Sequence, residues 1–184
     1  YTNLPFRLVV RALGGLGLAT TDLVNARSLI EKRAKTYKLL ETRPGDEPLA
    51  IQLFGGVPEE MREAAQVAEA RGAASIDINM GCPSKSVASS GSGAGLIRTP
   101  ELARAIIREA KRGIDDWASG RTLEQAGFQP EKAAVFRRLN ERRGGQARVE
   151  RRSIPLSVKT RIGYDAVTVE PWLEQLVAER PAAI

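Results

Sequence analysis

Histidine is absent from the 184-residue sequence, and cysteine occurs only once, as Cys82. Hydrolases that depend on an imidazole base within the chain are therefore disfavoured. A lone cysteine cannot form a disulfide within the chain, and a zinc site would have only one thiolate and carboxylates as ligands. We expect no disulfide framework and no metal site.

Long apolar runs are also missing. No stretch approaches the ~18 residues that are needed to span a bilayer. The most apolar glycine-rich stretch, 13–24, is interrupted by Thr20, Thr21 and Asp22, and no basic region followed by a cleavage site marks a secretory leader. We expect a cytoplasmic protein without membrane contact.

The composition is that of a globular domain, with 42% hydrophobic and 27% charged residues. The formal net charge is +6, and the segment 132–152 accounts for all of it, with eight Lys and Arg against two Glu. Such a cluster can bind phosphate backbones, but a solvated basic helix and loop has the same composition. Charge alone therefore leaves nucleic-acid binding open.

Short apolar strands alternate with amphipathic helices along the chain. The pattern predicts strands at 16–19, 48–54, 74–79 and 154–162, and helices at 5–13, 28–40, 58–72, 99–112 and 169–178. Strand starts about 25 to 35 residues apart are typical of βαβ units with a parallel sheet. This spacing fits a (β/α)8 barrel or a doubly wound sheet, although a barrel normally needs about 250 residues and eight units.

The segment 113–153 interrupts this alternation. It contains Trp117, a turn at 127–130, an amphipathic piece at 131–139 and the pair Gly144-Gly145. We interpret it as a basic insertion in a helix-to-strand connection. In a barrel, such connections lie on the face opposite the active site.

The end of the strand predicted at 74–79 carries Asn79 and the triplet Gly81-Cys82-Pro83. Parallel α/β folds place their reactive groups at this end of a strand. A lone cysteine is most often a small buried hydrophobe, but glycine and proline fix the backbone on both sides of Cys82. A thiol there can act as a general acid, and a thiolate as a nucleophile.

Lys159 and Arg161 alternate along an otherwise apolar strand, so both point to one face. Charged groups that face inward need anionic partners. A ligand would provide one, and an ion pair with Asp77 or another carboxylate is the structural alternative. Gln52 is a further polar residue inside a strand, for which a satisfied core amide is the simplest interpretation.

The segment 90–95, Ser-Gly-Ser-Gly-Ala-Gly, is similar in composition to a phosphate-binding loop. However, no Walker lysine follows it, and the dinucleotide fingerprint is not met in its context. Lid flexibility or close backbone packing is the favoured interpretation.

Taken together, these residues resemble the flavin-dependent tRNA-dihydrouridine synthases. The matching blocks, in the order of that family, are Thr2-Asn3-Leu4-Pro5-Phe6-Arg7, Thr21-Asp22-Leu23-Val24, Gln52-Leu53-Phe54-Gly55, Asp77-Ile78-Asn79-Met80-Gly81-Cys82-Pro83, Gly93-Ala94-Gly95-Leu96-Ile97 and Val158-Lys159-Thr160-Arg161-Ile162-Gly163. They cover most of the chain outside 113–153. One difference is Thr21-Asp22, where the family usually has Thr-Glu.

The resemblance implies a catalytic α/β domain over 1–184 that is part of a (β/α)8 TIM barrel, roughly strands 2 to 6, with the basic insertion at 113–153. It implies FMN as cofactor, NADPH as electron donor and tRNA as partner. By position, Gln52 and Lys159 would contact the flavin, Asn79 and Arg161 would hold the uracil, and Cys82 would protonate C5 while a hydride reaches C6.

The same resemblance predicts that parts of the family's fold lie outside this chain. These parts are the first strand, the later strands with the FMN phosphate site, and the C-terminal helical tRNA-binding domain. An incomplete barrel has open strand edges. We therefore expect the chain alone not to retain FMN and to be inactive, and stoichiometric flavin absorbance of a purified sample would refute this.

Two other functions remain open at this stage. One is another FMN barrel of the dihydropyrimidine or dihydroorotate dehydrogenase type, which turnover of free uracil but not of tRNA would indicate. The other is an inactive RNA-binding remnant that uses 132–152. In that case, charge reversal at Arg137, Arg138, Arg142 and Arg143 should abolish tRNA binding.

Overall fold

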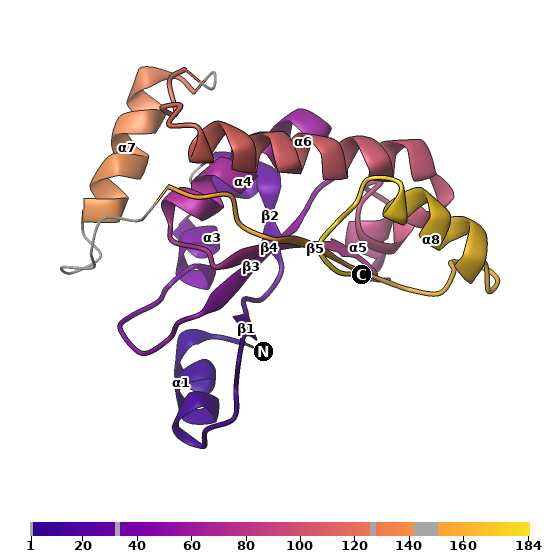
Figure 1. The fold of residues 1–184 in the computed structure, drawn as a ribbon, viewed down its shortest axis with the longest axis horizontal. Helices are drawn as coiled ribbons and strands as arrows, with labels where there is room; N and C mark the ends of the chain where they lie inside the picture. Colours follow the sequence, from indigo (N-terminus) through magenta and orange to yellow (C-terminus); the bar gives the residue numbers. More distant parts are fainter. Residues whose placement is uncertain (1, 32–33, 126–127, 142–150) are drawn as a thin grey trace.

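A curled parallel sheet forms the centre of the molecule, which we describe from a computed structural model for residues 2–31, 34–125, 128–141 and 151–184 (Figure 1). Its strands are β1 (Ala19–Thr20), β2 (Val24–Asn25), β3 (Leu49–Phe54), β4 (Ser75–Met80) and β5 (Leu156–Thr160). The order is β1-β3-β4-β5. Strand β2 also pairs with β3, but at Leu53 and Phe54, whereas β1 pairs with Leu49 and Ala50. All of these pairings are parallel.

Helices follow the strands in the order of a βα-repeat. They are α1 (Leu4–Ala12), α2 (Ala26–Ile30), α3 (Ala34–Leu39), α4 (Pro58–Ala70), α5 (Lys85–Ala88), the 3-10 helix η1 (Gly93–Arg98), α6 (Pro100–Ala118), α7 (Pro130–Glu141) and α8 (Val169–Val177). A parallel bridge from Ser157 to Ala183 adds a further edge beside β5. The curled sheet with its helices is the wall of a partial (β/α)8 barrel, which confirms the predicted fold class.

Helices α4 and α6 pack against each other over the sheet (Figure 1). Pro58 lies in the first turn of α4, with Glu59 and Glu60 near the positive end of the helix dipole. Gly113 is the point of closest approach, because a Cβ there would lie 2.3 Å from the carbonyl oxygen of Arg62. The expected end of this helix at 112 is therefore wrong: α6 continues to Ala118, and its glycine is a packing contact.

The N-terminal part of the chain differs from the prediction in its boundaries. Strand β1 covers only 19–20 because its pairing with β3 begins there, where the Ala19 N–H donates to the Pro48 carbonyl at 3.2 Å. Two helices, α2 and α3, replace the single helix predicted at 28–40. The cap of α2 is Asn25, whose Oδ1 accepts from the Ser28 N–H at 2.9 Å.

A buried ion pair fixes α1 to the rest of the chain. Arg7 is 2% exposed, and its Nη2 lies 2.7 Å from Oδ2 of the fully buried Asp46. The Asp46 carboxylate also accepts from the Thr42 hydroxyl at 3.2 Å and lies 3.5 Å from Nε of Arg11. Thr2, just before α1, is held to Asp22 through its backbone N–H at 3.2 Å. These contacts bring Thr2 to the mouth of the curled sheet.

The segment between α6 and β5 contributes to the core as well as to the surface. Leu123, Phe128 and Ala133 are all at most 5% exposed. Arg142 and Arg143, two of the four arginines considered for RNA binding, lie outside the described residues. Within the described part of the chain, no helix combines the length and the apolar character needed to cross a membrane.

Candidate functional site

The parallel register places the polar residues of three strands in neighbouring rows on the inner face of the sheet. Gln52 of β3 is paired with Asp77 of β4, and Asp77 with Ser157 of β5. Asn79 and Lys159 form the next row. Alternation sends the intervening Ile76, Ile78, Leu156 and Val158 toward the helices, where all are buried. The inner face is thus polar from the middle of the strands to their carboxyl ends.

A chain of hydrogen bonds connects these residues. Ser157 Oγ donates to Asp77 Oδ1 at 2.7 Å, and Gln52 Nε2 donates to Asp77 Oδ2 at 2.5 Å. Asn79 Nδ2 in turn donates to Gln52 Oε1 at 3.0 Å. Gln52 and Asn79 are 9% and 6% exposed, so both amides are held almost entirely by protein groups.

The Asn79 carbonyl holds the loop that contains Cys82. Its Oδ1 accepts from the backbone N–H groups of Gly81 at 3.2 Å and Cys82 at 2.9 Å. From the other side, the Ala94 N–H donates to the Cys82 carbonyl at 3.0 Å. The half-buried Cys82 is therefore fixed through both of its backbone polar groups.

The glycine-rich segment 90–95 packs closely against this loop. A Cβ at Gly93 would lie 2.8 Å from the Cys82 carbonyl oxygen, and one at Gly95 would lie 2.5 Å from the Ala88 carbonyl oxygen. Gly93 also has a φ of +54°, which disfavours other residues. Of the two favoured interpretations of this segment, lid flexibility and close backbone packing, these contacts show the second.

Arg161 and Lys159 occupy different environments. Arg161 Nε donates to the Gly81 carbonyl at 2.5 Å, so this side chain also supports the loop before Cys82. Lys159 is exposed on the inner face, and no described residue forms an ion pair or hydrogen bond with it. The alternative of an ion pair with Asp77 is not observed, because both Asp77 oxygens accept from Ser157 and Gln52.

A hollow of about 620 Å³ opens along this inner face. Its walls include Gln52, Asp77, Lys159, Thr21 and Thr2. This size lies within the range of about 300–1,000 Å³ that is typical of ligand pockets. A free ammonium and an amide in one wall suit a flat heteroaromatic ring that carries negative charge when reduced. The residues present therefore fit the flavin that the resemblance implies.

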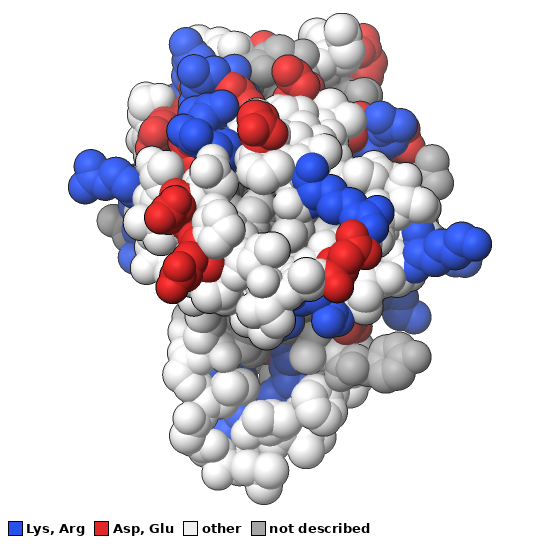
Figure 2. Space-filling view, turned by 90° about the vertical axis from the view of Figure 1, so that its right-hand side faces the viewer, with Lys and Arg blue, Asp and Glu red and all other residues white. Residues whose placement is uncertain are grey.

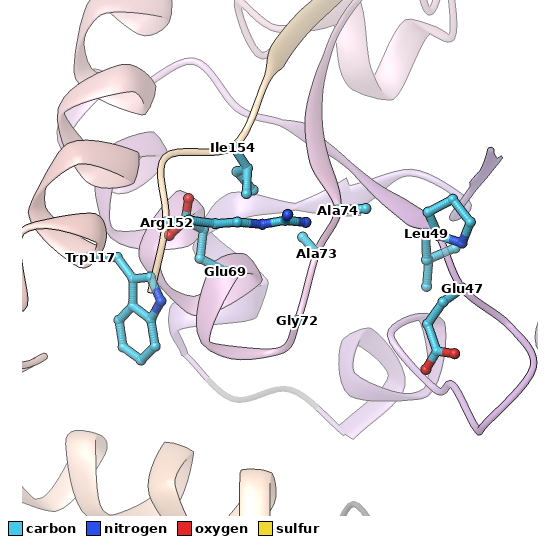
Figure 3. A pocket seen from close by; sticks show the side chains of 10 residues that line it. Glu47, Leu49, Glu69, Gly72, Ala73, Ala74, Trp117, Arg152 and Ile154 are labelled. Carbon is cyan, nitrogen blue, oxygen red and sulfur yellow. The ribbon is translucent and has the colours of Figure 1, made fainter. Parts of the chain in front are cut away.

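A second pocket, of about 310 Å³, lies at the opposite ends of the strands (Figure 3). Glu69 from the last turn of α4 lies at its wall, Trp117 comes from α6, and Arg152 extends across it from the segment before β5. Both Glu69 oxygens are buried and find no hydrogen-bond donor among the described residues. Burial, followed by the charge of Asp115, raises the pKa of Glu69 to about 8, against the opposing effect of Arg151 and Arg152.

The electrostatics of the outer surface are mixed. Figure 2 shows acidic and basic side chains interspersed on the face that bears α8. Arg104 and Arg108 of α6 both pair with Glu179, at 2.7 and 2.6 Å. In the described part of the chain, much of the basic charge on this flank is therefore paired.

All five predicted site residues lie in the carboxyl-terminal halves of β3, β4 and β5 or within two residues after these strands. Hydrogen bonds bring four of them together through Gly81, namely Gln52, Asn79, Cys82 and Arg161, whereas Lys159 stands free in the hollow. Sequence reasoning considered Asp77 only as an alternative ion-pair partner and missed Ser157. The alternation of Asp77 with Asn79 along one strand was the available signal for the first of these.

Comparisons with known proteins point in one direction. A family described as "Dihydrouridine synthase (Dus)" matches residues 1–119. "Probable tRNA-dihydrouridine synthase 1" of Synechocystis sp. is 39% identical over 114 residues, which are 62% of this chain and 32% of that protein. "tRNA-dihydrouridine synthase B" of Pseudomonas aeruginosa is 36% identical over 62% of this chain and 34% of its own length. "tRNA-dihydrouridine(16) synthase" of Aquipseudomonas alcaligenes is 31% identical over 70% of this chain and 43% of its own length.

Proposed function

The chain belongs to the dihydrouridine synthase family, and from this premise we propose that it carries the catalytic centre of an enzyme that reduces uridine in tRNA to 5,6-dihydrouridine. The matched regions cover only 32–43% of the three relatives named above, so the activity is assigned to the complete protein. The observation that carries the proposal is the placement of Cys82, fixed by Asn79, at the end of a strand whose inner face borders a hollow walled by Gln52 and Lys159.

The wall of the hollow provides two groups that suit a flavin ring, Lys159 and Gln52. FMN bound between these groups would supply hydride-transfer chemistry for C6 of the uracil, with NADPH as the source of electrons. Lys159 places a positive charge in the hollow, where it stabilises negative charge on the reduced ring. Gln52 lines the same hollow, and its amide is held in place by Asp77 and Asn79.

The remaining residues act on the uracil, which must leave the base stack of the tRNA to reach the site. The Cys82 thiol donates the proton that C5 receives as the C5=C6 double bond is reduced. Asn79 uses one hydrogen of its amide nitrogen for Gln52, so the other is able to donate to a uracil carbonyl. The terminal nitrogens of Arg161 offer further donors, because its hydrogen bond within the described part of the chain runs from Nε to the Gly81 carbonyl.

The test uses the protein encoded by the complete open reading frame around this chain, purified with its flavin. Cys82→Ala should lower dihydrouridine formation in unmodified tRNA by about 10²–10⁴-fold, the contribution of a positioned general acid. Reduction of the flavin by NADPH should be unchanged, since Cys82 acts only on the uracil. Ser84→Ala, a substitution at an exposed neighbour, is the matched control and should retain activity.

Two results would overturn the proposal. The first is a Cys82→Ala protein that reduces tRNA at the wild-type rate. The second is a wild-type protein that reduces free uracil and leaves tRNA unchanged, which would favour a dihydropyrimidine-type oxidoreductase.

A further inference from the structure

We propose that Asp77 is a positioning residue that sets the orientation of the Gln52 and Asn79 amides and, through them, the conformation of the Cys82 loop. The inference rests on the function proposed above, because it assigns Asp77 to the catalytic centre of that reaction. Asp77 does not need to touch the uracil in this role. It acts by determining which way two other side chains face.

The argument begins with the chemistry of the groups. An ionised carboxylate only accepts hydrogen bonds, whereas an amide has a donor end and an acceptor end. Asp77 Oδ2 accepts from Gln52 at 2.5 Å, so the nitrogen of that amide must face Asp77. The Gln52 oxygen then faces Asn79 and accepts from Asn79 Nδ2 at 3.0 Å.

The same logic carries the orientation on to Cys82. With its nitrogen committed to Gln52, Asn79 turns its oxygen toward the backbone N–H groups of Gly81 and Cys82, at 3.2 and 2.9 Å. Both of these groups are donors, so an acceptor is required at this place. Each contact in the series from Asp77 to Cys82 thus pairs a donor with an acceptor.

The reversed orientation would fail at both ends. Turning the two amides over would place the Gln52 oxygen against the Asp77 carboxylate and the Asn79 nitrogen against two N–H groups. Gln52 and Asn79 are 9% and 6% exposed, so water has little access to compensate for these contacts. An acceptor oxygen of residue 77 that faces Gln52 therefore selects one of two amide arrangements, and only that one holds the Cys82 loop.

Ser157 provides a matched control for this role. It donates to the other oxygen of Asp77, at 2.7 Å, and takes no part in the series that leads to Cys82. Removing Ser157 takes away one hydrogen bond of the carboxylate and leaves Gln52 anchored. Removing Asp77 takes away the anchor itself.

The experiment measures how fast iodoacetamide alkylates Cys82 in the complete chain, across pH 6 to 9. Cys82 is the only cysteine among these 184 residues, and mass spectrometry of the peptide that contains it separates its signal from that of any other cysteine. Asp77→Ala should raise the rate at least fivefold, because the loop loses its hold. Ser157→Ala should stay within twofold of the wild type. Asp77→Asn should also stay within twofold, since the asparagine oxygen can accept from Gln52 while its nitrogen donates to the serine hydroxyl.

Any of three results would overturn the inference. One is an Asp77→Ala chain that reacts at the wild-type rate. Another is equal acceleration by Ser157→Ala, which would indicate loss of general stability. The third is an Asp77→Asn chain that behaves like Asp77→Ala, because an acceptor at this position would then not be sufficient.

A measurement on the wild-type chain covers the case in which Asp77→Ala does not fold. The side-chain amide protons of Gln52 and Asn79 should exchange with water at least tenfold more slowly than those of the exposed Gln125. Equal exchange rates would overturn the inference. Neither experiment needs flavin or tRNA, so their outcome is independent of whether the proposed reaction is observed.

Discussion

Glu69 provides the sharpest test of the energetics of this fold. Its side chain is 2% exposed at the end of α4, and neither carboxylate oxygen has a hydrogen-bond donor within the described part of the chain. Replacing it by glutamine keeps the size of the side chain and removes the titrating group. We predict that Glu69→Gln stabilises the chain at alkaline pH and has little effect at pH 5.

The magnitude and the sign follow from the pKa of Glu69, which burial and the charge of Asp115 raise from 4.5 to about 8. At about 1.36 kcal/mol for each pKa unit, the ionised form is disfavoured by at most about 5 kcal/mol in the folded chain. The unfolded chain ionises near pH 4.5, so between pH 4.5 and 8 it binds fewer protons than the folded chain. The free energy of unfolding therefore falls through this window and levels off above it.

The assay is urea unfolding of wild type and Glu69→Gln at half-unit steps from pH 5 to pH 9.5. The two chains should be similar at pH 5, and the variant should be more stable above pH 8 by up to about 5 kcal/mol. Glu59→Gln, an exposed position on the same helix, should follow the wild-type profile. Arg152→Gln should move the wild-type transition to higher pH, because the Arg152 charge lowers the pKa of Glu69. Parallel profiles for wild type and Glu69→Gln would refute the reasoning.

Two further predictions concern a buried ion pair and a helix packing contact. Asp46→Ala should destabilise the chain by about 3–5 kcal/mol in urea unfolding, because it leaves the buried Arg7 guanidinium without its partner. Asp165→Ala, which breaks an exposed ion pair, should leave the midpoint unchanged, and equal losses in the two variants would contradict the role of burial. Gly113→Ala should cost about 1–3 kcal/mol in the same assay because of the contact with the Arg62 carbonyl. Gly17→Ala is the control and should be neutral, because a Cβ at Gly17 would have no neighbour within 4 Å. A Gly113→Ala chain that is more stable than the wild type would contradict the prediction, because α4 and α6 would then separate at little cost.

The order of strands and helices could be predicted from the sequence because hydrophobic periodicity is local. Three predicted strands and most helices are found within a few residues of their expected positions. The end of α6 was predicted wrongly because glycine disfavours a helix in isolation. Only the close approach of α4 explains why Gly113 lies within the helix, and this contact depends on residues about fifty positions earlier in the chain.

For the candidate site, the sequence predicted which side chains face inward but not which of them lie next to each other. Alternation along β4 and β5 indicated that Asn79 and Lys159 face inward, because the side-chain period of a strand is two. The register between strands is a tertiary property, and it brings Gln52, Asp77 and Ser157 into one row. Without that register, the sequence left two partners open for Lys159, a ligand and an ion pair with a carboxylate such as Asp77.

Two carboxylates at opposite ends of the sheet show how environment decides the effect of a charge. Asp77 receives two hydrogen bonds and holds the loop of Cys82 through them, so its neutral replacement by alanine should loosen that loop. Glu69 receives none from the described residues, so its neutral replacement by glutamine should stabilise the chain above pH 8. Removing the first carboxylate is thus expected to loosen the structure, whereas removing the second is expected to stabilise it. The difference follows from the donors around each group, since a buried charge with donors is compensated and one without them is not. This account would be contradicted if Glu69→Gln lowered the stability of the chain above pH 8. It would also be contradicted if Asp77→Ala left the rate of Cys82 alkylation unchanged.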